Sequence, residues 1–215
     1  MISGDLLKYN LETKKFIFWD LESNGLHLHY TRPFEISYLL YQGNRFQKEK
    51  QIFLKYPDYK IRPEIAKHTH YDKNKIDEIG IDPKSGLQDV LSYLLDPEYH
   101  IVFSNGLNYD CMVFHNSCKE LGLECGYSWL PRCYDINALF KGMKLGRKVD
   151  NDNLLAYQLS CNNVVQKGLK SNLQYMAKEF NIEIEAETDQ FHGALFDSKI
   201  TSQIFFELIK KIDVK

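Results

Sequence analysis

The most constraining feature of the sequence is an apolar run, residues 16–19, that leads directly into two acids, Asp20 and Glu22. The run is rich in strand-forming residues and stops at an Asn-Gly pair, so it predicts a buried β-strand. Because side chains alternate across a strand, both acids project from the same face. Two like charges there repel each other unless a positive group lies between them. Exposed acids in a loop beyond the strand are the alternative interpretation, since the D-x-E pair is common by chance.

Further strands and several helices are expected along the chain. Residues 34–41 and 45–56 flank a Gln-Gly-Asn turn and predict a pair of strands, and a short buried strand is expected at residues 100–104. The spacing of apolar residues predicts helices at residues 85–95, 107–121, 135–141, 153–160, 171–180 and 193–212. Three strands joined by tight turns, followed by alternating helices and strands, predict an α/β fold. Its sheet should be mixed, antiparallel at first and parallel later, and flanked by helices.

The composition fits a single globular domain. The chain has 215 residues, 44% hydrophobic and 26% charged. No repeat or Pro/Gly-rich linker divides it, so one domain is expected at residues 15–215 after a short polar N-terminal leader at residues 1–14. No apolar stretch could span a bilayer and no signal peptide is recognisable, which predicts a cytoplasmic protein without a membrane partner. The formal net charge of −2 argues against coating of long nucleic acid, but not against an enzyme that holds a few terminal nucleotides.

The five cysteines give no sign of a cross-linked or zinc-bound framework. Their number is odd and no CxxC spacing occurs, which argues against disulfides and against a thiolate zinc site. Cys111, Cys118 and Cys125 recur every seven residues, as one stripe of a helix would. We therefore expect small buried apolar side chains and no disulfide partner.

Three more residues suggest chemistry. Asp197 lies on the apolar side of the last predicted helix, where an ionised group is rarely left unless it is paired or bound to a metal. Asp110 follows a buried strand, and ligands gather at the carboxyl ends of parallel strands. Taken alone, Asp110 could equally be an acid in the first turn of a helix. His192 stands five residues before Asp197, and histidine titrates near neutral pH, so it is a candidate general base. A surface or core histidine is the ordinary alternative.

Together these residues resemble the three motifs of the DEDD 3′→5′ exonucleases, in the histidine-bearing, DnaQ-like branch (DEDDh). Residues 20–26, DLESNGL, are similar to D-x-E-T-x-G-L, with Ser and Asn in place of the usual threonines. Residues 105–110, NGLNYD, resemble the stretch in which an Asn precedes an aromatic–Asp pair, with the spacing of the bacterial exonuclease I group. Residues 192–197, HGALFD, match H-x-A-x-x-D. The motifs occur in the family's order, so the resemblance covers residues 15–212.

The resemblance implies a ribonuclease H-like fold with a five-stranded sheet and two divalent cations, Mg²⁺ or Mn²⁺. Asp20, Glu22 and Asp197 would bind one ion. Asp20 would bridge to the second, which Asp110 would hold directly or through water, and His192 would take the proton from the attacking water. Hard carboxylate oxygens suit such ions, and a pair of ions about 4 Å apart can stabilise the attacking and leaving oxygens.

Candidate substrate contacts follow from the same analogy. Ser23 would face the 3′ hydroxyl, Leu26 would wedge against the terminal base, and Asn105 is a further candidate for substrate binding. Tyr30 and Phe34, close to the first motif, could stack on a base, although core packing is the expected role of Phe34.

The function implied is hydrolysis of single-stranded DNA from its 3′ end, in degradation, repair or proofreading, with release of nucleoside 5′-monophosphates. A ribonuclease of the same fold that trims RNA ends or short oligonucleotides shares these residues, because the contact with the 2′-hydroxyl is what tells RNA from DNA. An inactive nucleic-acid-binding relative is a third interpretation, and the presence of all four acids and the histidine counts against it. The implied partners are a 3′ end of DNA or RNA and a polymerase or another replication or repair protein.

Overall fold

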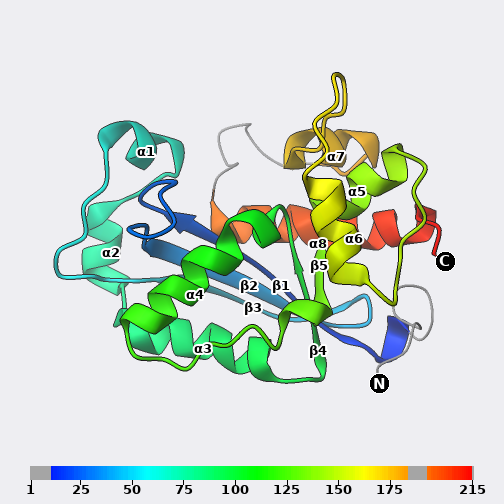
Figure 1. Ribbon diagram of the computed structural model, residues 1–215. Coiled ribbons are helices and arrows are strands. Elements are labelled where there is room, and N and C mark those ends of the chain that lie inside the picture. Colours follow the sequence, from blue (N-terminus) through cyan, green and yellow to red (C-terminus); the bar gives the residue numbers. More distant parts are fainter. Residues whose placement is uncertain (1–10, 184–192, 215) are drawn as a thin grey trace.

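A five-stranded mixed sheet forms the centre of the molecule (Figure 1). The computed structural model describes residues 11–183 and 193–214. Its strands are β1 (Lys15–Ser23), β2 (Pro33–Gln42), β3 (Arg45–Phe53), β4 (Tyr99–Phe103) and β5 (Cys133–Asp135). In the order β3-β2-β1-β4-β5, the first three are antiparallel neighbours, while β4 runs parallel to β1 and to β5. The predicted mixed sheet is confirmed, and β5 is a strand that the sequence pattern did not locate.

Helices cover both faces of this sheet. Helices α3 (Pro83–Leu95) and α4 (Asp110–Glu120) pack on one face, and α8 (Ala194–Lys211) packs on the other. The remaining α-helices in the described ranges are α1 (Pro63–His68), α2 (Lys73–Ile79), α5 (Ile136–Lys144), α6 (Leu154–Asn162) and α7 (Leu173–Glu179), with 3₁₀ turns at Leu11–Thr13, Gly106–Asn108 and Leu130–Arg132. Helices α1 and α2 lie at one end of the sheet, and α5, α6 and α7 lie at the other (Figure 1). None of the helices so described is long and apolar enough to cross a membrane.

Strand β1 is buried on both faces, as its continuous apolar run requires. The ring of Phe18 packs edge-on against Phe205 of α8, with the ring centroids 5.5 Å apart. On the opposite face, Trp19 packs edge-on against Phe114 of α4 at 5.3 Å. Aromatic rings favour such edge-to-face contacts. Since the strand is fixed from both sides, alternation places the next residue, Asp20, on the α8 side of the sheet.

Helices α1 and α2 have no counterpart among the predicted elements. They are six and seven residues long, and Ile76 is their only buried residue, so no apolar stripe marks them in the sequence. Local signals start them instead. Pro63 occupies the first turn of α1, and the Asp72 side chain caps α2 by accepting hydrogen bonds from the amides of Asn74 and Lys75. These two helices form a wall beside the carboxyl end of β1.

The connection between β4 and α4 differs from the prediction. The helix expected at residues 107–121 is wrong at its start, because Gly106–Asn108 forms a 3₁₀ turn and α4 begins only at Asp110. Between them, Tyr109 has φ −140° and ψ −65°, which interrupts the helix. Before the turn, Asn105 has φ 61°, in the left-handed region that Asn adopts more readily than most residues. This break determines where α4 begins and therefore where the side chain of Asp110 is placed.

Asp135, at the end of β5, fixes this turn from the neighbouring strand. Its carboxylate is fully buried and accepts hydrogen bonds from the amides of Asn105 (2.9 Å) and Leu107 (3.3 Å). It also accepts from the amide of Asn137 in α5 (3.0 Å) and from the side chain of Asn162 in α6 (3.1 Å). Burial raises the pKa of Asp135, and the amide of Asn105 and the side chain of Asn162 oppose that shift. One carboxylate therefore joins the β4–α4 turn to α5 and α6.

We predict that Asp135→Asn lowers the free energy of unfolding by about 2–4 kcal/mol, because an amide group would set a donor against the donors that surround it. Unfolding in urea, followed by circular dichroism, measures the change. Asp152→Asn alters an exposed acid and serves as the control, with an expected change below about 0.5 kcal/mol. An Asp135→Asn protein as stable as the wild type would show that this network does not hold the turn.

Candidate active site

Three carboxylates converge at the carboxyl end of β1. Asp20 and Glu22 project from one face of the strand, and Asp197 comes from the first turn of α8, which packs on that face. One oxygen of each residue lies within 4.8 Å of one oxygen of each of the other two. The structure thus brings together three residues that the motifs single out. Their catalytic role stays a prediction.

Asp110, the first residue of α4, lines the same cavity and is 7% exposed. Burial, followed by the charges of Asp135 and Asp197, raises its pKa to about 8. Burial and then Asp197 raise the pKa of Glu22 to about 10. Burial and then Asp110 hold the pKa of Asp20 well above its usual range. Each of these contributions disfavours the ionised forms, and none of the named contributions from residues 11–183 and 193–214 is that of a positive charge.

The donor set fits a hard divalent cation. All three clustered ligands are carboxylate oxygens, which Mg²⁺ and Mn²⁺ prefer, and no histidine or cysteine joins them within residues 11–183 and 193–214. A doubly charged ion between the carboxylates would replace their repulsion by attraction. Asp20, Glu22 and Asp197 could hold one such ion. Asp110 could contribute to a second ion. Its charge raises the pKa of Asp20, and the charge of Asp197 raises its own pKa.

The carboxylates lie in a cavity of about 730 Å³ whose walls come from β1, the loop after it, α1, the turn before α4, the starts of α5 and α7, and α8. All three predicted substrate contacts, Ser23, Leu26 and Asn105, line this cavity. Leu26 is 84% exposed, so its side chain is available to a ligand. Asn105 is exposed at the rim, and its left-handed backbone gives a structural reason for an Asn there, beside the predicted contact with substrate.

Tyr109 links the first motif to the second. Its hydroxyl lies 2.6 Å from that of Ser23 and donates a hydrogen bond to the carbonyl of Gly25. The Ser23 hydroxyl also contacts the Gly25 carbonyl, at 3.2 Å, and Ser23 is only 7% exposed. Ser23, assigned by analogy to the 3′ hydroxyl of the substrate, is therefore oriented by Tyr109. The aromatic residue directly before Asp110 in the second motif was the available signal.

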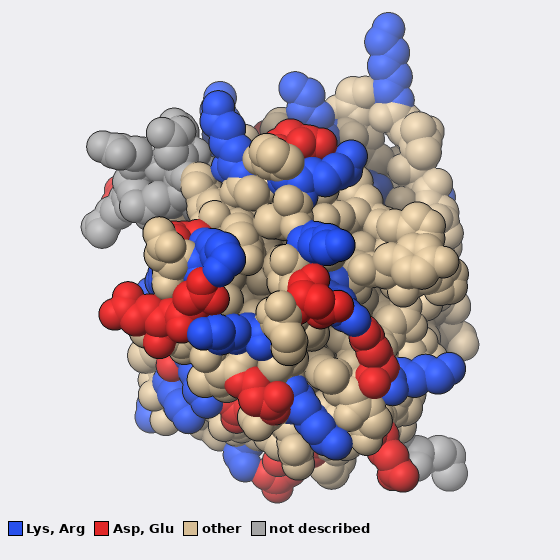
Figure 2. Space-filling view, turned by 90° about the vertical axis from the view of Figure 1, so that its left-hand side faces the viewer, with Lys and Arg blue, Asp and Glu red and all other residues tan. Residues whose placement is uncertain are grey.

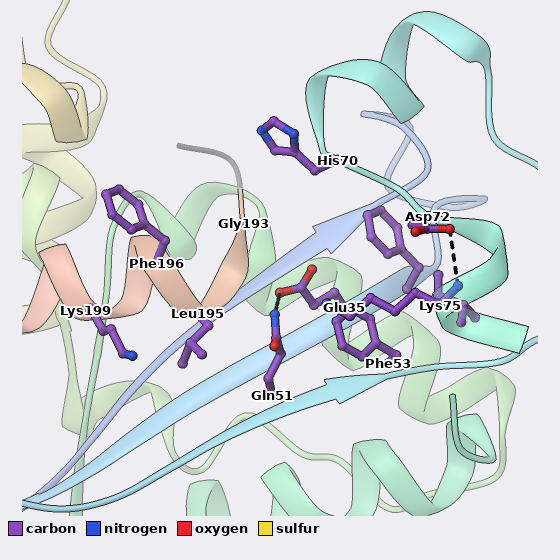
Figure 3. A pocket seen from close by; sticks show the side chains of 12 residues that line it. Glu35, Gln51, Phe53, His70, Asp72, Lys75, Gly193, Leu195, Phe196 and Lys199 are labelled. Atoms are coloured by element: carbon purple, nitrogen blue, oxygen red, sulfur yellow. Dashed lines mark hydrogen bonds between the residues drawn. The ribbon is translucent and has the colours of Figure 1, made fainter. Parts of the chain in front are cut away.

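Glu35 is a second buried acid that the sequence analysis does not single out. It lies on β2 directly opposite Glu22 in the strand register and is 5% exposed. Like charges in opposite positions on paired strands are destabilising. Burial raises the pKa of Glu35, while a hydrogen bond of 2.9 Å from the Gln51 side chain opposes that shift (Figure 3). An acid inside an apolar strand is the same signal that marks Asp20.

Glu35 also faces the start of α8. The two lie along a second cavity, of about 490 Å³, between β2, β3, α2 and α8 (Figure 3). The amides of Leu195 and Ala194, the first residues of α8, lower the pKa of Glu35. The N-cap of the helix is Gly193, which has no side chain to satisfy these amides. A strand carboxylate therefore helps to set the helix start from which Asp197 projects.

His192 lies outside the described residues, so the predicted general base is assigned by its motif alone. Helix α8 begins two residues later, at Ala194. Asp197, five residues after His192, is in place within the first turn of that helix. Of the five predicted active-site residues, the four acids thus line one cavity.

The sheet order, the helix layers and the acids at the end of the central strand define a ribonuclease H-like fold, and comparison with solved structures agrees. A structure of exonuclease I superposes with a TM-score of 0.71 at 17% identity, over 92% of this chain and 41% of that one. Exonuclease I of E. coli in complex with a dA16 oligonucleotide gives 0.70 at 16% identity, over 92% and 41%. The zinc-bound form of the complex of the E. coli enzyme with single-stranded DNA gives 0.69 at 17%, over 92% and 40%. The expected likeness to exonuclease I is confirmed at the level of the fold.

One curated protein extends the likeness to the sequence. The PolC-type DNA polymerase III of Mycoplasma genitalium is 25% identical over 204 residues, which are 94% of this chain and 12% of that protein. No protein-family model matches the chain. The chain spans about two fifths of the exonuclease I chains and a much smaller part of the polymerase.

We predict that the metal-free protein loses stability as the pH rises from about 5 to 9. The pKa values of Glu22 and Asp110 in the folded state, about 10 and 8, lie above those of the unfolded chain. The folded protein therefore binds more protons than the unfolded one in this window, and the free energy of unfolding falls with pH. Thermal unfolding in EDTA measures the trend. Added Mg²⁺ should restore stability at the upper end, because it binds the ionised carboxylates of the folded state.

For the same reason, Glu22→Gln should stabilise the metal-free protein at pH 8. An amide has no proton to lose, so the substitution removes the penalty of keeping this group protonated, and every tenfold difference in proton affinity corresponds to about 1.4 kcal/mol. Glu64→Gln, which changes an exposed acid of α1, is the matched control and should have little effect. If Glu22→Gln is less stable than the wild type in EDTA at this pH, burial and repulsion do not raise the pKa of Glu22 in the way described here.

Proposed function

We propose that the protein is a metal-dependent 3′→5′ exonuclease that hydrolyses single-stranded DNA and releases nucleoside 5′-monophosphates. The observation that carries the proposal is the convergence of Asp20, Glu22 and Asp197, with Asp110, in one open cavity. Structures of the same fold, those of E. coli exonuclease I, hold single-stranded DNA. A cavity of this size that is lined by four carboxylates suits the end of a strand.

In this proposal the carboxylates hold two divalent cations, Mg²⁺ or Mn²⁺, which supply Lewis-acid stabilisation of the attacking and leaving oxygens. Asp20, Glu22 and Asp197 would hold one ion, and Asp110, together with Asp20, would hold the other. His192 accepts the proton of the attacking water. Because the pKa values of these acids are raised, bound cations would favour their ionised forms.

The terminal nucleotide occupies the cavity above these acids. Leu26 packs against its base, and Ser23, oriented by Tyr109, contacts its 3′ hydroxyl. Asn105 contacts the substrate from the opposite rim. The likeness to a polymerase over 94% of this chain supports a replication or repair protein as a partner of the enzyme.

The test is a time course with 5′-labelled single-stranded DNA and RNA of matched sequence, in Mg²⁺, Mn²⁺ or EDTA. We expect a ladder that shortens from the 3′ end of DNA with either metal and no shortening in EDTA. Asp20→Asn should lower the rate at least about 100-fold, since loss of a metal ligand removes several kcal/mol of transition-state stabilisation. Faster shortening of RNA than of DNA would show that RNA is the preferred substrate.

Asp152→Asn is the control for this experiment and should leave the rate unchanged, because its side chain is exposed and outside the cavity. The stability of Asp20→Asn should equal or exceed that of the wild type, so loss of activity cannot be attributed to unfolding. Absence of cleavage of both substrates by the wild type would favour an inactive nucleic-acid-binding relative.

We predict that the rate falls as the pH drops into the acid range, because protonated His192 cannot accept a proton. The measurement is kcat against pH at metal concentrations that saturate the enzyme at every pH. His192→Ala should be slower and should lack this limb of the profile. A flat wild-type profile across the acid range would exclude His192 as the base.

A further inference from the structure

The loop that follows the first motif, residues 24–32, presents two large apolar side chains to solvent. Leu26 is 84% exposed and Tyr30 is 79% exposed. Both line a cavity of about 570 Å³ that adjoins the carboxylate cavity, and the two cavities share Gly25, Leu26 and Arg62. A continuous surface therefore leads from the carboxylates past Leu26 to Tyr30.

The Tyr30 ring is held by a tight turn. The carbonyl of His27 accepts hydrogen bonds from the amides of Tyr30 (3.0 Å) and Thr31 (2.9 Å). The rings of His27 and Tyr30 lie 4.8 Å apart, inclined at 35°. His27 thus supports one side of the tyrosine ring, while most of its surface stays exposed. By contrast, Phe34 is 1% exposed, so the expectation that it packs in the core holds.

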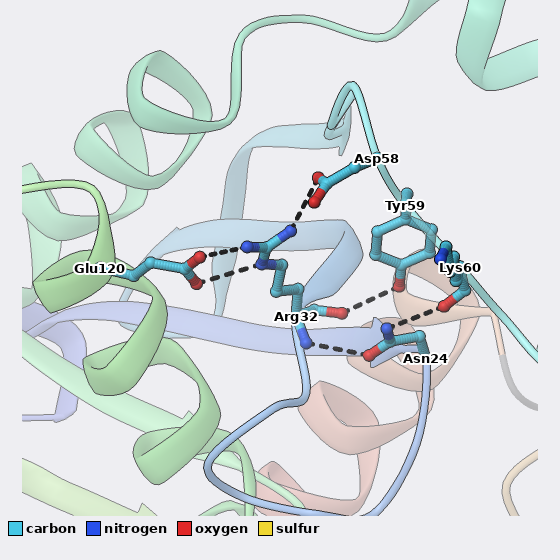
Figure 4. Close-up of polar contacts among 6 residues, drawn as sticks. All are labelled: Asn24, Arg32, Asp58, Tyr59, Lys60 and Glu120. Atoms are coloured by element: carbon cyan, nitrogen blue, oxygen red, sulfur yellow. Dashed lines mark hydrogen bonds and ion pairs between the residues drawn. The ribbon is translucent and has the colours of Figure 1, made fainter.

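Arg32 fixes the base of this loop (Figure 4). Its guanidinium makes two hydrogen bonds to Glu120 at the end of α4 and one, of 3.0 Å, to Asp58. Its amide donates to the Asn24 side chain, which donates in turn to the Lys60 carbonyl, both at 2.9 Å. The loop is therefore joined to α4 and to the segment before α1. An exposed aromatic on so firmly held a loop is preorganised for a ligand.

An exposed cationic side chain lies beside this surface. Arg62, at the start of α1, has a 71% exposed side chain that pairs with Glu64 at 3.4 Å. Pairs this exposed contribute little to stability, so the guanidinium can exchange its partner for a phosphate at low cost. Lys60 and Lys67 are exposed on the same segment. Basic side chains gather along the upper part of this face of the molecule (Figure 2).

We propose that Tyr30 and Arg62 form a subsite for the nucleotides that directly precede the 3′-terminal one in single-stranded DNA. Tyr30 stacks on an unpaired base and Arg62 binds the backbone phosphate. The proposal rests on the function proposed above, because a strand that ends at the carboxylates can continue past Leu26 into the adjoining cavity, which Tyr30 and Arg62 line. Every base has a face that can stack, so the subsite accepts any sequence.

Two substrates of different length distinguish the contribution of this subsite from that of the catalytic cavity. In the p-nitrophenyl ester of thymidine 5′-monophosphate, p-nitrophenol replaces the upstream nucleoside, so the ester ends before Tyr30. A 5′-labelled oligothymidylate extends across it. We expect Tyr30→Ala to raise Kd and KM for the oligonucleotide by about 5- to 150-fold, the effect of one lost base stack. The value of kcat/KM for the ester should stay unchanged, and Tyr30→Trp should retain tight binding.

Fluorescence anisotropy in EDTA gives Kd without hydrolysis. Arg62→Gln should weaken binding and lower the slope of log Kd against log salt by about one. Phe46→Ala, which removes an exposed aromatic of β3, is the control. It should change neither Kd for the oligonucleotide nor kcat/KM for the ester. Equal losses on both substrates, or an unchanged Kd for Tyr30→Ala, would overturn the subsite. Failure of the wild type to hydrolyse either the ester or the oligonucleotide would refute the proposed function, whereas the anisotropy measurement tests the subsite independently of hydrolysis.

Discussion

The cost of clustering carboxylates away from solvent, through lost hydration first and mutual repulsion second, is the constraint on which the rest of this structure depends. Asp20, Glu22 and Asp110 all have raised pKa values, with burial as the largest cause and neighbouring acids as the next. A sequence selected for stability alone would place such groups in solvent or pair them with lysine and arginine. Here the frame around them supplies the stability instead. The aromatic contacts of Phe18 and Trp19 fix the central strand from both faces immediately before the acids begin.

Further buried polar groups then position the acids that come from other elements. Asp135 accepts two amides of the turn before α4 and so fixes the point at which Asp110 begins that helix. Glu35 stands between Gln51 and the first amides of α8, the helix that carries Asp197. In both cases an acid that is not itself a proposed metal ligand satisfies backbone donors next to one that is. Satisfied buried networks of this kind restrict geometry more strongly than apolar packing, because an unmatched donor is costly.

The sequence predicts the periodic parts of the fold and the acids that interrupt them. Residues 16–19 and 34–41 show strand patterns, and Asp20 and Asp197 are recognisable because each follows or occupies an apolar face. The turn at Tyr109 and helices α1 and α2 were not predictable in this way, since their geometry comes from Asp135 and from short capping contacts rather than from an apolar period. Glu35 carried the same signal as Asp20 but belonged to no motif. Periodicity therefore identifies layers, whereas the connections that shape the cavity depend on individual hydrogen bonds between residues far apart in the chain.

Helix α4 connects the carboxylates with the loop that presents Leu26 and Tyr30. Its first residue, Asp110, contributes a carboxylate to the base of the cavity, and its last residue, Glu120, holds Arg32 at the root of the loop that presents Leu26 and Tyr30. The eleven residues of α4 therefore connect a carboxylate of the cavity with the anchor of this loop. The Asn24 side chain links the same loop to the segment before α1 by hydrogen bonds. A strand end bound at the carboxylates would therefore meet a surface whose spacing is already fixed by the fold, and the loop need not order itself when the strand arrives.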